Sequence, residues 1–257
     1  MLGAIALLSG VALLGQFVRG MTGAGSAIVF NAMFVILFSF GWTAGLTLHE
    51  GLYWMAIANA FGALVMGGSL RHSLHLDRLT ALFLLGMLPS SAVFAFALTR
   101  MEGSDLALLL AVVVTASGIY LAAKPRPAPA DPARLRKVAF PVGLASGVIG
   151  GLYGMGGPIS FLLFSAADPH DTSLFRARLT MVTLGSNFLR LAVLASQGVY
   201  TTERVVMAGA TLPAVLLGIF VGMWTHRFVK PGPFRAVLGT LIAIAGIVAL
   251  VQWLWLD

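Results

Sequence analysis

Two arginines, Arg19 and Arg190, lie within apolar stretches of the kind that cross a lipid bilayer. A charged side chain at the centre of a bilayer is costly, so it faces a cavity or a partner. The planar guanidinium group offers paired N–H donors to two oxygens of one anion. We therefore expect both arginines to bind a small anion. For Arg190 the alternative is a side chain that extends to the outer membrane surface, because the residue lies near the end of its predicted span.

Two glycine-rich motifs interrupt long apolar segments and align with each other position by position. Residues 20–28 read GMTGAGSAI, and residues 151–159 read GLYGMGGPI. A helix that begins after such a break presents unpaired N–H groups and a partial positive charge, which attract anions. The alternative is that the small residues only permit close helix packing. The motif positions that we predict to bind the anion are Gly23, Gly25, Ser26, Gly154, Gly156, Gly157 and Ser160.

Asparagine side chains form a second group of candidates. Asn187 lies one helical turn before Arg190 and therefore shares its helix face. Asn59 and Asn31 are weaker candidates, and Asn59 aligns with Asn187 once a small insertion or deletion after the glycine motifs is allowed. We predict that Asn59 and Asn187 contact the anion. The alternative for all three asparagines is a hydrogen bond between helices.

His49 and Glu50 adjoin the hydrophobic body of a predicted span. A histidine beside a carboxylate could carry a coupling proton, and the pair could instead meet an arginine. A further alternative is an interfacial helix start, where the helix dipole favours Glu. The other histidines fall in predicted loops and show no metal-ligand spacing: His72, His75, His170 and His226.

Long apolar segments must position all of these residues. Of the 257 residues, 59% are hydrophobic and 10% are charged, whereas soluble domains are about 45–50% apolar and about 25% charged. Segments of about 20 residues, the length that crosses a bilayer, lie at 49–70, 79–99, 104–123, 174–195, 205–225 and 234–255. Two further segments, 3–40 and 138–167, are cut by the glycine motifs into pieces of about 13 to 16 residues. Such pieces are short for crossing a bilayer of normal thickness.

These elements predict an all-α polytopic membrane protein built from two inverted repeats. The first repeat covers residues 1–123, a basic Pro-rich cytoplasmic linker covers 124–137, and the second repeat covers 138–257. Each repeat contains a glycine-broken hairpin, either re-entrant or a short double crossing, followed by three transmembrane helices. Glycine-interrupted segments at matching positions of two inverted halves are typical of secondary transporters.

The distribution of lysine and arginine predicts the orientation in the membrane. If each hairpin returns to the side where it starts, twelve basic residues lie on the cytoplasmic side and two lie outside. If each broken segment crosses once, the corresponding counts are eight and six. The positive-inside rule favours the first arrangement, in which both termini are periplasmic.

Several classes of protein are disfavoured by what the chain lacks. There is no cysteine, so disulfides, thiolate metal sites and cysteine nucleophiles are excluded, and no HExxH zinc-protease motif occurs. We expect no enzyme activity, no metal and no cofactor. Because the chain is so apolar, we interpret the net charge of +7 as favouring a lipid bilayer rather than nucleic acid as the partner. An anion channel and, less favoured, an intramembrane enzyme are the alternatives to a transporter, and a homodimer is one option for assembly.

Residues 151–158, the weaker copy of this motif at 20–28, the four-span halves and the basic linker resemble the TauE/SafE family of sulfite and organosulfonate exporters. The resemblance extends over essentially the whole chain. It departs from the family at Ala24 and Ser26, where small glycines are usual. The resemblance implies a transporter of small anions, such as sulfite, sulfoacetate or related sulfonates, in the bacterial inner membrane. Coupling of this transport to protons is one option.

Overall fold

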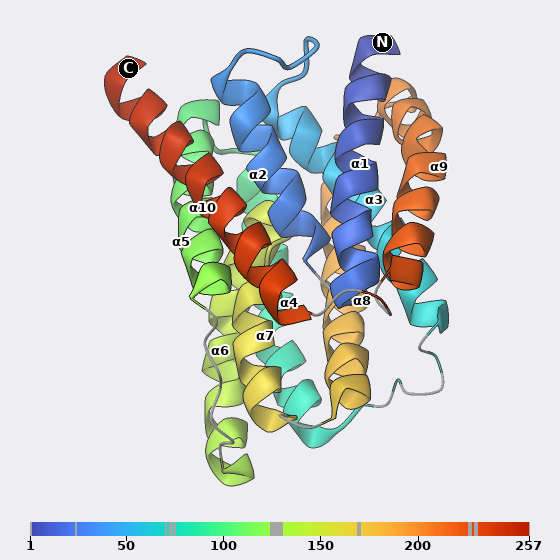
Figure 1. Ribbon diagram of the computed structural model, residues 1–257, viewed down its shortest axis with the longest axis vertical. Coiled ribbons are helices and arrows are strands. Elements are labelled where there is room, and N and C mark those ends of the chain that lie inside the picture. Colours follow the sequence, from blue (N-terminus) through green and yellow to red (C-terminus); the bar gives the residue numbers. More distant parts are fainter. Residues whose placement is uncertain are drawn as a thin grey trace. The chain divides into compact units, whose positions relative to one another are not determined.

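The computed structural model describes residues 2–23, 25–69, 71, 74, 76–123, 131–168, 171–225, 228 and 231–256 (Figure 1). Regular structure in these ranges is α-helical throughout. In chain order the helices are α1 (Leu2–Thr22), α2 (Ser26–Ser39), α3 (Leu48–Ser69), α4 (Arg78–Leu98), α5 (Gly103–Ala122), α6 (Pro132–Tyr153), α7 (Gly157–Ala167), α8 (Thr172–Ser196), α9 (Thr202–Thr225) and α10 (Pro231–Leu256). The loop histidines His72, His75, His170 and His226, and linker residues 124–130, lie outside the described residues.

Among the described helices, eight are long and apolar enough to cross a membrane. The six unbroken spans that the sequence predicts correspond to α3, α4, α5, α8, α9 and α10, and their ends agree within three residues. Helices α2 and α7 are shorter, with 14 and 11 residues. The prediction of an all-helical, multi-pass membrane protein is confirmed.

The two broken segments differ from the prediction in the lengths of their pieces. Helices α1 and α6 have 21 and 22 residues, so only α2 and α7 are too short to span a bilayer. Helix α6 gains its length from the predicted linker, because it begins at Pro132. Asp131 caps it by accepting a hydrogen bond from the Ala133 N–H at 2.9 Å, and proline suits a first helical turn. The prediction of similar short pieces was therefore wrong.

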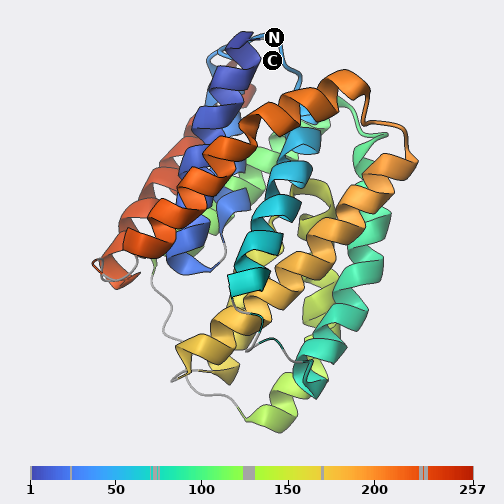
Figure 2. The ribbon, with the colours of Figure 1, turned by 90° about the vertical axis from the view of Figure 1, so that its right-hand side faces the viewer.

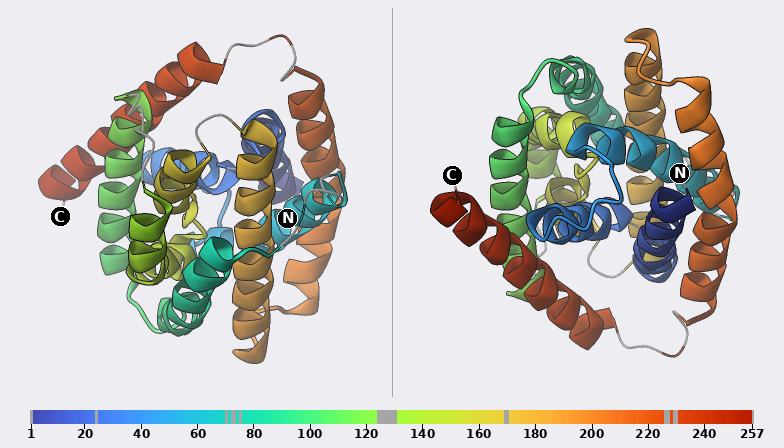
Figure 3. Two further views of the ribbon diagram at one scale, coloured as in Figure 1. Left: turned by 90° about the horizontal axis from the view of Figure 1, so that it is seen from below. Right: turned by 90° about the horizontal axis from the view of Figure 1, so that it is seen from above.

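The helices form two compact units, and each unit mixes segments from both halves of the sequence. One unit comprises residues Met1–Ala58, Arg100–Pro125 and Tyr200–Asp257. Within this unit α1 packs along α9, and α10 packs along α5 (Figures 1 and 3). Glycines let the backbones touch: a Cβ on Gly222 would lie 2.2 Å from the Phe17 carbonyl oxygen, and one on Gly118 would lie 2.2 Å from the Ala243 nitrogen.

The other unit comprises residues Asn59–Thr99 and Arg126–Val199. Within this unit α4 packs against α6 and against α8 (Figure 2). A Cβ on Gly143 would lie 2.2 Å from the Phe83 carbonyl oxygen, and one on Gly151 would lie 2.4 Å from the Ser91 carbonyl oxygen. These close backbone contacts fix α6 on α4 up to the break that follows α6.

The order of long and short helices is the same in α1–α5 as in α6–α10. The pairing of α1 with α9 also corresponds to the pairing of α6 with α4, since α1 aligns with α6 and α9 with α4 in this order. Both observations agree with two copies of one arrangement. The inverted orientation of the copies and the boundaries at residues 124–137 stay predictions.

Candidate anion-binding site at the helix breaks

The first break separates α1 from α2 and contains two glycines with a left-handed backbone. Gly23 has φ 84° and Gly25 has φ 97°, values that residues with a Cβ rarely adopt. Gly25 directly precedes α2, and its carbonyl oxygen accepts a hydrogen bond from the Ile28 N–H at 3.1 Å. The predicted glycine positions therefore lie in the connection itself, at the start of the short helix.

Arg19 lies in the last turn of α1 and is buried, with 2% of its surface exposed. Its Nε donates a hydrogen bond to Ser26 Oγ at 3.0 Å, which ties the end of α1 to the start of α2. A cation in the last turn of a helix is stabilised by the helix dipole. The structure thus brings two of the predicted site residues together across the first break.

The second break separates α6 from α7 and is built differently. Gly154 ends α6 with φ 66°, and its N–H donates to the Gly150 carbonyl oxygen at 2.8 Å. Gly156 has an ordinary φ of −60°, but a Cβ there would lie 2.9 Å from Ser146 Oγ. That Oγ donates to the Gly156 carbonyl oxygen at 2.8 Å. A Cβ on Gly157 would meet no described heavy atom within 4 Å beyond its own helix and chain neighbours, so this position at the start of α7 is open.

Arg190 of α8 is fully buried and reaches the end of α6. Its Nε donates to the Gly151 carbonyl oxygen at 2.9 Å, and its Nη2 donates to the Leu152 carbonyl oxygen at 3.0 Å. Carbonyl groups in the last turn of a helix have no partner within the helix, and the guanidinium group satisfies two of them. The same cation opposes the negative end of the α6 dipole. Arg190 therefore caps α6 and places a charge beside the second break.

The other predicted contacts are buried side chains. The Ser160 hydroxyl donates to the carbonyl oxygens of Gly156 and Gly157, each at 3.0 Å, so it is directed back toward the preceding turn. Asn59 and Asn187 are buried in α3 and α8.

Sequence analysis missed one buried amide near the first break. Gln16 lies one turn before Arg19 in α1, and its Nε2 donates to the Ala58 carbonyl oxygen at 3.1 Å. The weaker candidate Asn31 donates from Nδ2 to the Ala27 carbonyl oxygen at 2.7 Å, within its own helix. A lone glutamine in an apolar helix was the signal that could have identified Gln16.

The two buried arginines do not occupy equivalent repeat positions. In the register of the two glycine motifs Arg19 aligns with Gly150, and in the register of the two aligned asparagines Arg190 aligns with Gly62. Each break nevertheless has one buried guanidinium group within 3.0 Å of an oxygen at the break. The two breaks therefore share a buried guanidinium group that comes from different sequence positions.

The family model described as sulfite exporter TauE/SafE matches residues 8–249, nearly the whole chain. The chain belongs to the TauE/SafE family. The resemblance inferred from the glycine motifs is thereby confirmed, and the family is one of membrane transporters rather than enzymes. No curated protein and no solved structure matches the chain.

The predicted coupling residues of this TauE/SafE protein lie at the start of α3. Thr47 and Glu50 form a capping box, in which the Glu50 carboxylate accepts from the Thr47 N–H at 2.9 Å and Thr47 Oγ1 accepts from the Glu50 N–H at 3.2 Å. Arg204 Nη2 donates to the Glu50 carboxylate at 3.1 Å. The ring of His49 faces Tyr53, with centroids 6.1 Å apart. Glu50 thus has the two structural roles that were the alternatives to proton coupling.

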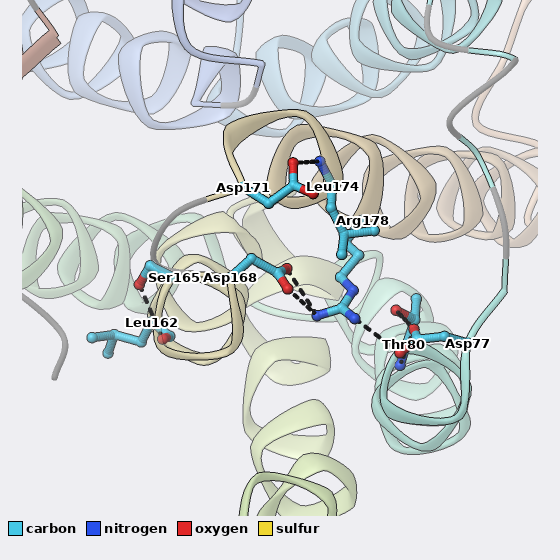
Figure 4. Close-up of polar contacts among 8 residues, drawn as sticks. All are labelled: Asp77, Thr80, Leu162, Ser165, Asp168, Asp171, Leu174 and Arg178. Carbon is cyan, nitrogen blue, oxygen red and sulfur yellow. Dashed lines mark hydrogen bonds and ion pairs between the residues drawn. The ribbon is translucent and has the colours of Figure 1, made fainter. Parts of the chain in front are cut away.

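A cluster of ion pairs that sequence analysis did not single out joins α4, α7 and α8 (Figure 4). Arg178 Nη1 lies 2.9 and 2.8 Å from the two carboxylate oxygens of Asp168, and Arg178 Nη2 lies 2.9 Å from Asp77 Oδ2. Asp77 caps the start of α4, and Asp168 follows the end of α7. Acidic residues beside predicted span ends were the available signal. Within the part of the chain that the structure describes, no group of three His, Asp or Glu side chains could hold a metal ion.

Proposed function

We propose that this TauE/SafE protein is a secondary transporter that exports small anions, such as sulfite or organosulfonates, across the bacterial inner membrane. One observation carries the proposal: each of the two broken helices has a buried arginine beside the break. In this proposal the anion binds at the breaks, where a guanidinium group and the positive end of a short helix lie close together.

The short helices α2 and α7 support a binding site at the breaks. With 14 and 11 residues they cannot cross a bilayer, so the connections that precede them lie at membrane depth in the proposed topology. Broken backbone at that depth is stable only where it is buried in protein or lines a watery cavity. A Cβ on Gly157 would meet no described heavy atom within 4 Å beyond its own helix and chain neighbours, and we assign the anion to this side of the first turn of α7.

The placement of the acidic residues supports an anionic substrate. The described carboxylates all lie at helix caps, in first turns or at helix ends: Glu50, Asp77, Glu102, Asp105, Asp131, Asp168, Asp171 and Glu203. Arg19 and Arg190 instead bond to hydroxyl and carbonyl oxygens, which carry only partial charge. A transported anion would add charge-assisted hydrogen bonds to guanidinium groups of this kind.

We further propose the predicted membrane orientation, with the linker at 124–137 cytoplasmic and both termini periplasmic. Twelve basic residues then lie inside against two outside, which the positive-inside rule favours. Proton coupling through His49 and Glu50 stays a prediction. The Glu50 carboxylate also has a structural role, because it belongs to the capping box and pairs with Arg204.

Counterflow in vesicles tests the proposed function. Purified protein in liposomes loaded with unlabelled sulfite or methanesulfonate should concentrate the same labelled anion from outside, because a transporter exchanges its substrate across the membrane. Arg190→Ala in matched liposomes should lose this counterflow. Flux without counterflow would identify a channel instead, and no flux of either anion contradicts the proposal.

A further inference from the structure

Asp77, Asp168 and Arg178 form a cluster in which two carboxylates share one guanidinium group (Figure 4). The side chains of Arg178 and Asp168 are 11% and 6% exposed, whereas that of Asp77 is 29% exposed. The two carboxylates therefore lie close together in a mostly buried place, and each disfavours the charged form of the other. Such an arrangement favours the uptake of one proton.

The two carboxylates differ in their other partners. Asp77 accepts hydrogen bonds from both the N–H and the hydroxyl of Thr80. Burial works against the charged form of Asp77, but these hydrogen bonds together with Arg178 hold its pKa below the usual value. Burial raises the pKa of Asp168; Arg178 offsets this only in part, and Asp171 and Asp77 add to the rise. A proton that reaches the cluster therefore binds to Asp168.

A cavity of about 140 Å³ adjoins the cluster and is lined by Asp77, Arg136 and Arg178 together with apolar residues. This volume is well above the roughly 10–15 Å³ that one water molecule needs. The charged residues that line the cavity are one carboxylate, Asp77, and two guanidinium groups, Arg136 and Arg178; Asp168 is bound to Arg178 beside it. Protonation of Asp168 removes one negative charge beside the cavity, which makes the cavity more favourable for an anion.

The unit that contains the first break has a matching ion pair with reversed charges. In the register of the two aligned asparagines, Glu50 aligns with Arg178. The partner of Glu50, Arg204, lies at the start of α9, as Asp77 lies at the start of α4. Because one carboxylate there meets one guanidinium group, no negative charge is left over. The additional carboxylate, Asp168, distinguishes the cluster at Arg178 from this simple pair.

We propose that Asp168 is a proton-binding site that controls the access of a small anion to Arg178 in the neighbouring cavity. While Asp168 is ionised, its carboxylate occupies Arg178 Nη1 in the way that a bound anion would. When water delivers a proton to Asp168, the neutral carboxyl group binds Arg178 more weakly, and a dissolved oxyanion takes its place on the guanidinium N–H groups. The proton returns to water when the anion leaves, and only the O–H bond forms and breaks. The identity of the anion rests on the proposed function, whereas the proton site does not.

Exchange of labelled methanesulfonate in vesicles with equal pH on both sides tests this proposal. A sulfonate is the anion of a strong acid and stays ionised as the pH is lowered, so a change in rate reports on the protein. Wild-type exchange should rise several-fold as the pH falls. Asp168→Asn imitates the protonated residue and should exchange at the acidic wild-type rate at every pH. A wild-type pH profile in Asp168→Asn, or a folded variant without exchange, overturns the proposal.

Asp171→Asn is the matched control. It is the same chemical change three residues away, where the carboxylate caps α8 through the Leu174 N–H at 2.9 Å and does not pair with Arg178. Asparagine caps helices as well as aspartate does, so exchange should persist. Its rise in acid should persist too but occur at a lower pH, because Asp171 adds to the raised pKa of Asp168. If Asp168→Asn fails to fold, Asp168→Glu keeps a titratable group and should keep a pH-dependent rate. A flat profile in Asp168→Glu contradicts the proposal.

Thermal unfolding in detergent examines the proton site without any substrate. Because the folded state raises the pKa of Asp168, it binds this proton more readily than the unfolded state. Lowering the pH from neutral should therefore raise the Tm of the wild type relative to Asp168→Asn. If this difference appears but the wild type exchanges no anion, the proposed function fails and the proton site stands. A difference in Tm that does not change with pH rejects the proton site.

Discussion

At the residue scale, each buried arginine donates hydrogen bonds to oxygens at its helix break. Arg190 donates to two carbonyl oxygens of α6, and Arg19 donates to the hydroxyl of Ser26. A carboxylate in their place would cancel the charge, whereas carbonyl and hydroxyl oxygens carry only partial charge. These hydrogen bonds fix the two guanidinium groups in position beside the breaks.

Arg190→Lys keeps the charge but loses the fork that reaches two carbonyl oxygens, so we expect weaker anion binding, and Arg190→Ala should lose binding. The expected cost is about 1.5–3 kcal/mol, the range for hydrogen bonds to charged groups. Because Arg190 also caps α6, both variants should unfold at a lower temperature than the wild type. Affinity for sulfite or methanesulfonate and the Tm, measured on the same preparations, separate the two effects. If Arg190→Ala binds the anion with wild-type affinity, the role of Arg190 is limited to capping α6.

Gly156 and Gly157 are adjacent in sequence but should respond differently to substitution. A Cβ on Gly156 would lie 2.7 Å from Met87 Cε and 2.9 Å from Ser146 Oγ, so Gly156→Val should destabilise the protein by about 1–3 kcal/mol. Gly157 is open, so Gly157→Ala should keep the wild-type Tm and reduce counterflow by filling the space assigned to the anion. Wild-type counterflow in Gly157→Ala would show that the anion does not occupy this space. Sequence alone does not separate the two glycines; the structure does, because only Gly156 approaches neighbouring atoms closely, with an ordinary φ of −60°.

At the element scale, glycines determine how the long helices pair. Gly222 of α9 faces the backbone of α1, whereas a Cβ on Gly209 of the same helix would meet no described heavy atom within 4 Å outside its own helix. We expect Gly222→Val to force α9 away from α1 and to cost about 1–3 kcal/mol. Gly209→Val should leave the Tm close to that of the wild type. Equal Tm values for the two variants would contradict glycine-mediated packing of this pair.

The elements were predictable to the extent that their signals are local. Length and hydropathy determine the six unbroken helices, whose ends therefore agree within three residues. The start of α6 was not predictable in this way, because Asp131 and Pro132 lie among polar residues that resemble a linker. The glycines and arginines of the breaks are recognisable by type and repetition. The ion pair of Arg178 with Asp77 joins residues 101 positions apart, so it appears only once the chain is folded.

At the scale of the whole molecule, the orientation in the membrane is open to a direct experiment. The chain contains no cysteine, so one introduced cysteine is a unique label. An impermeant maleimide should label Asp257→Cys and Glu102→Cys in intact spheroplasts, and Lys137→Cys only after lysis, because the proposed topology places the linker inside. Labelling of Asp257→Cys only after lysis, together with the linker, would contradict the inverted repeat.

The mixing of sequence halves in each compact unit has a consequence for synthesis. Helix α1 ends at residue 22 and its partner α9 begins at residue 202, whereas α4 ends at residue 98 and its partner α6 begins at residue 132. At a synthesis rate of ~5–20 residues per second, roughly 10–40 s pass between the synthesis of α1 and the start of α9. The unit built from α4, α6, α7 and α8 has all of its residues once Val199 is made. The unit that contains the N-terminus is therefore the last to be completed, and until then the glycine face of α1 must tolerate lipid or a helper protein as its neighbour.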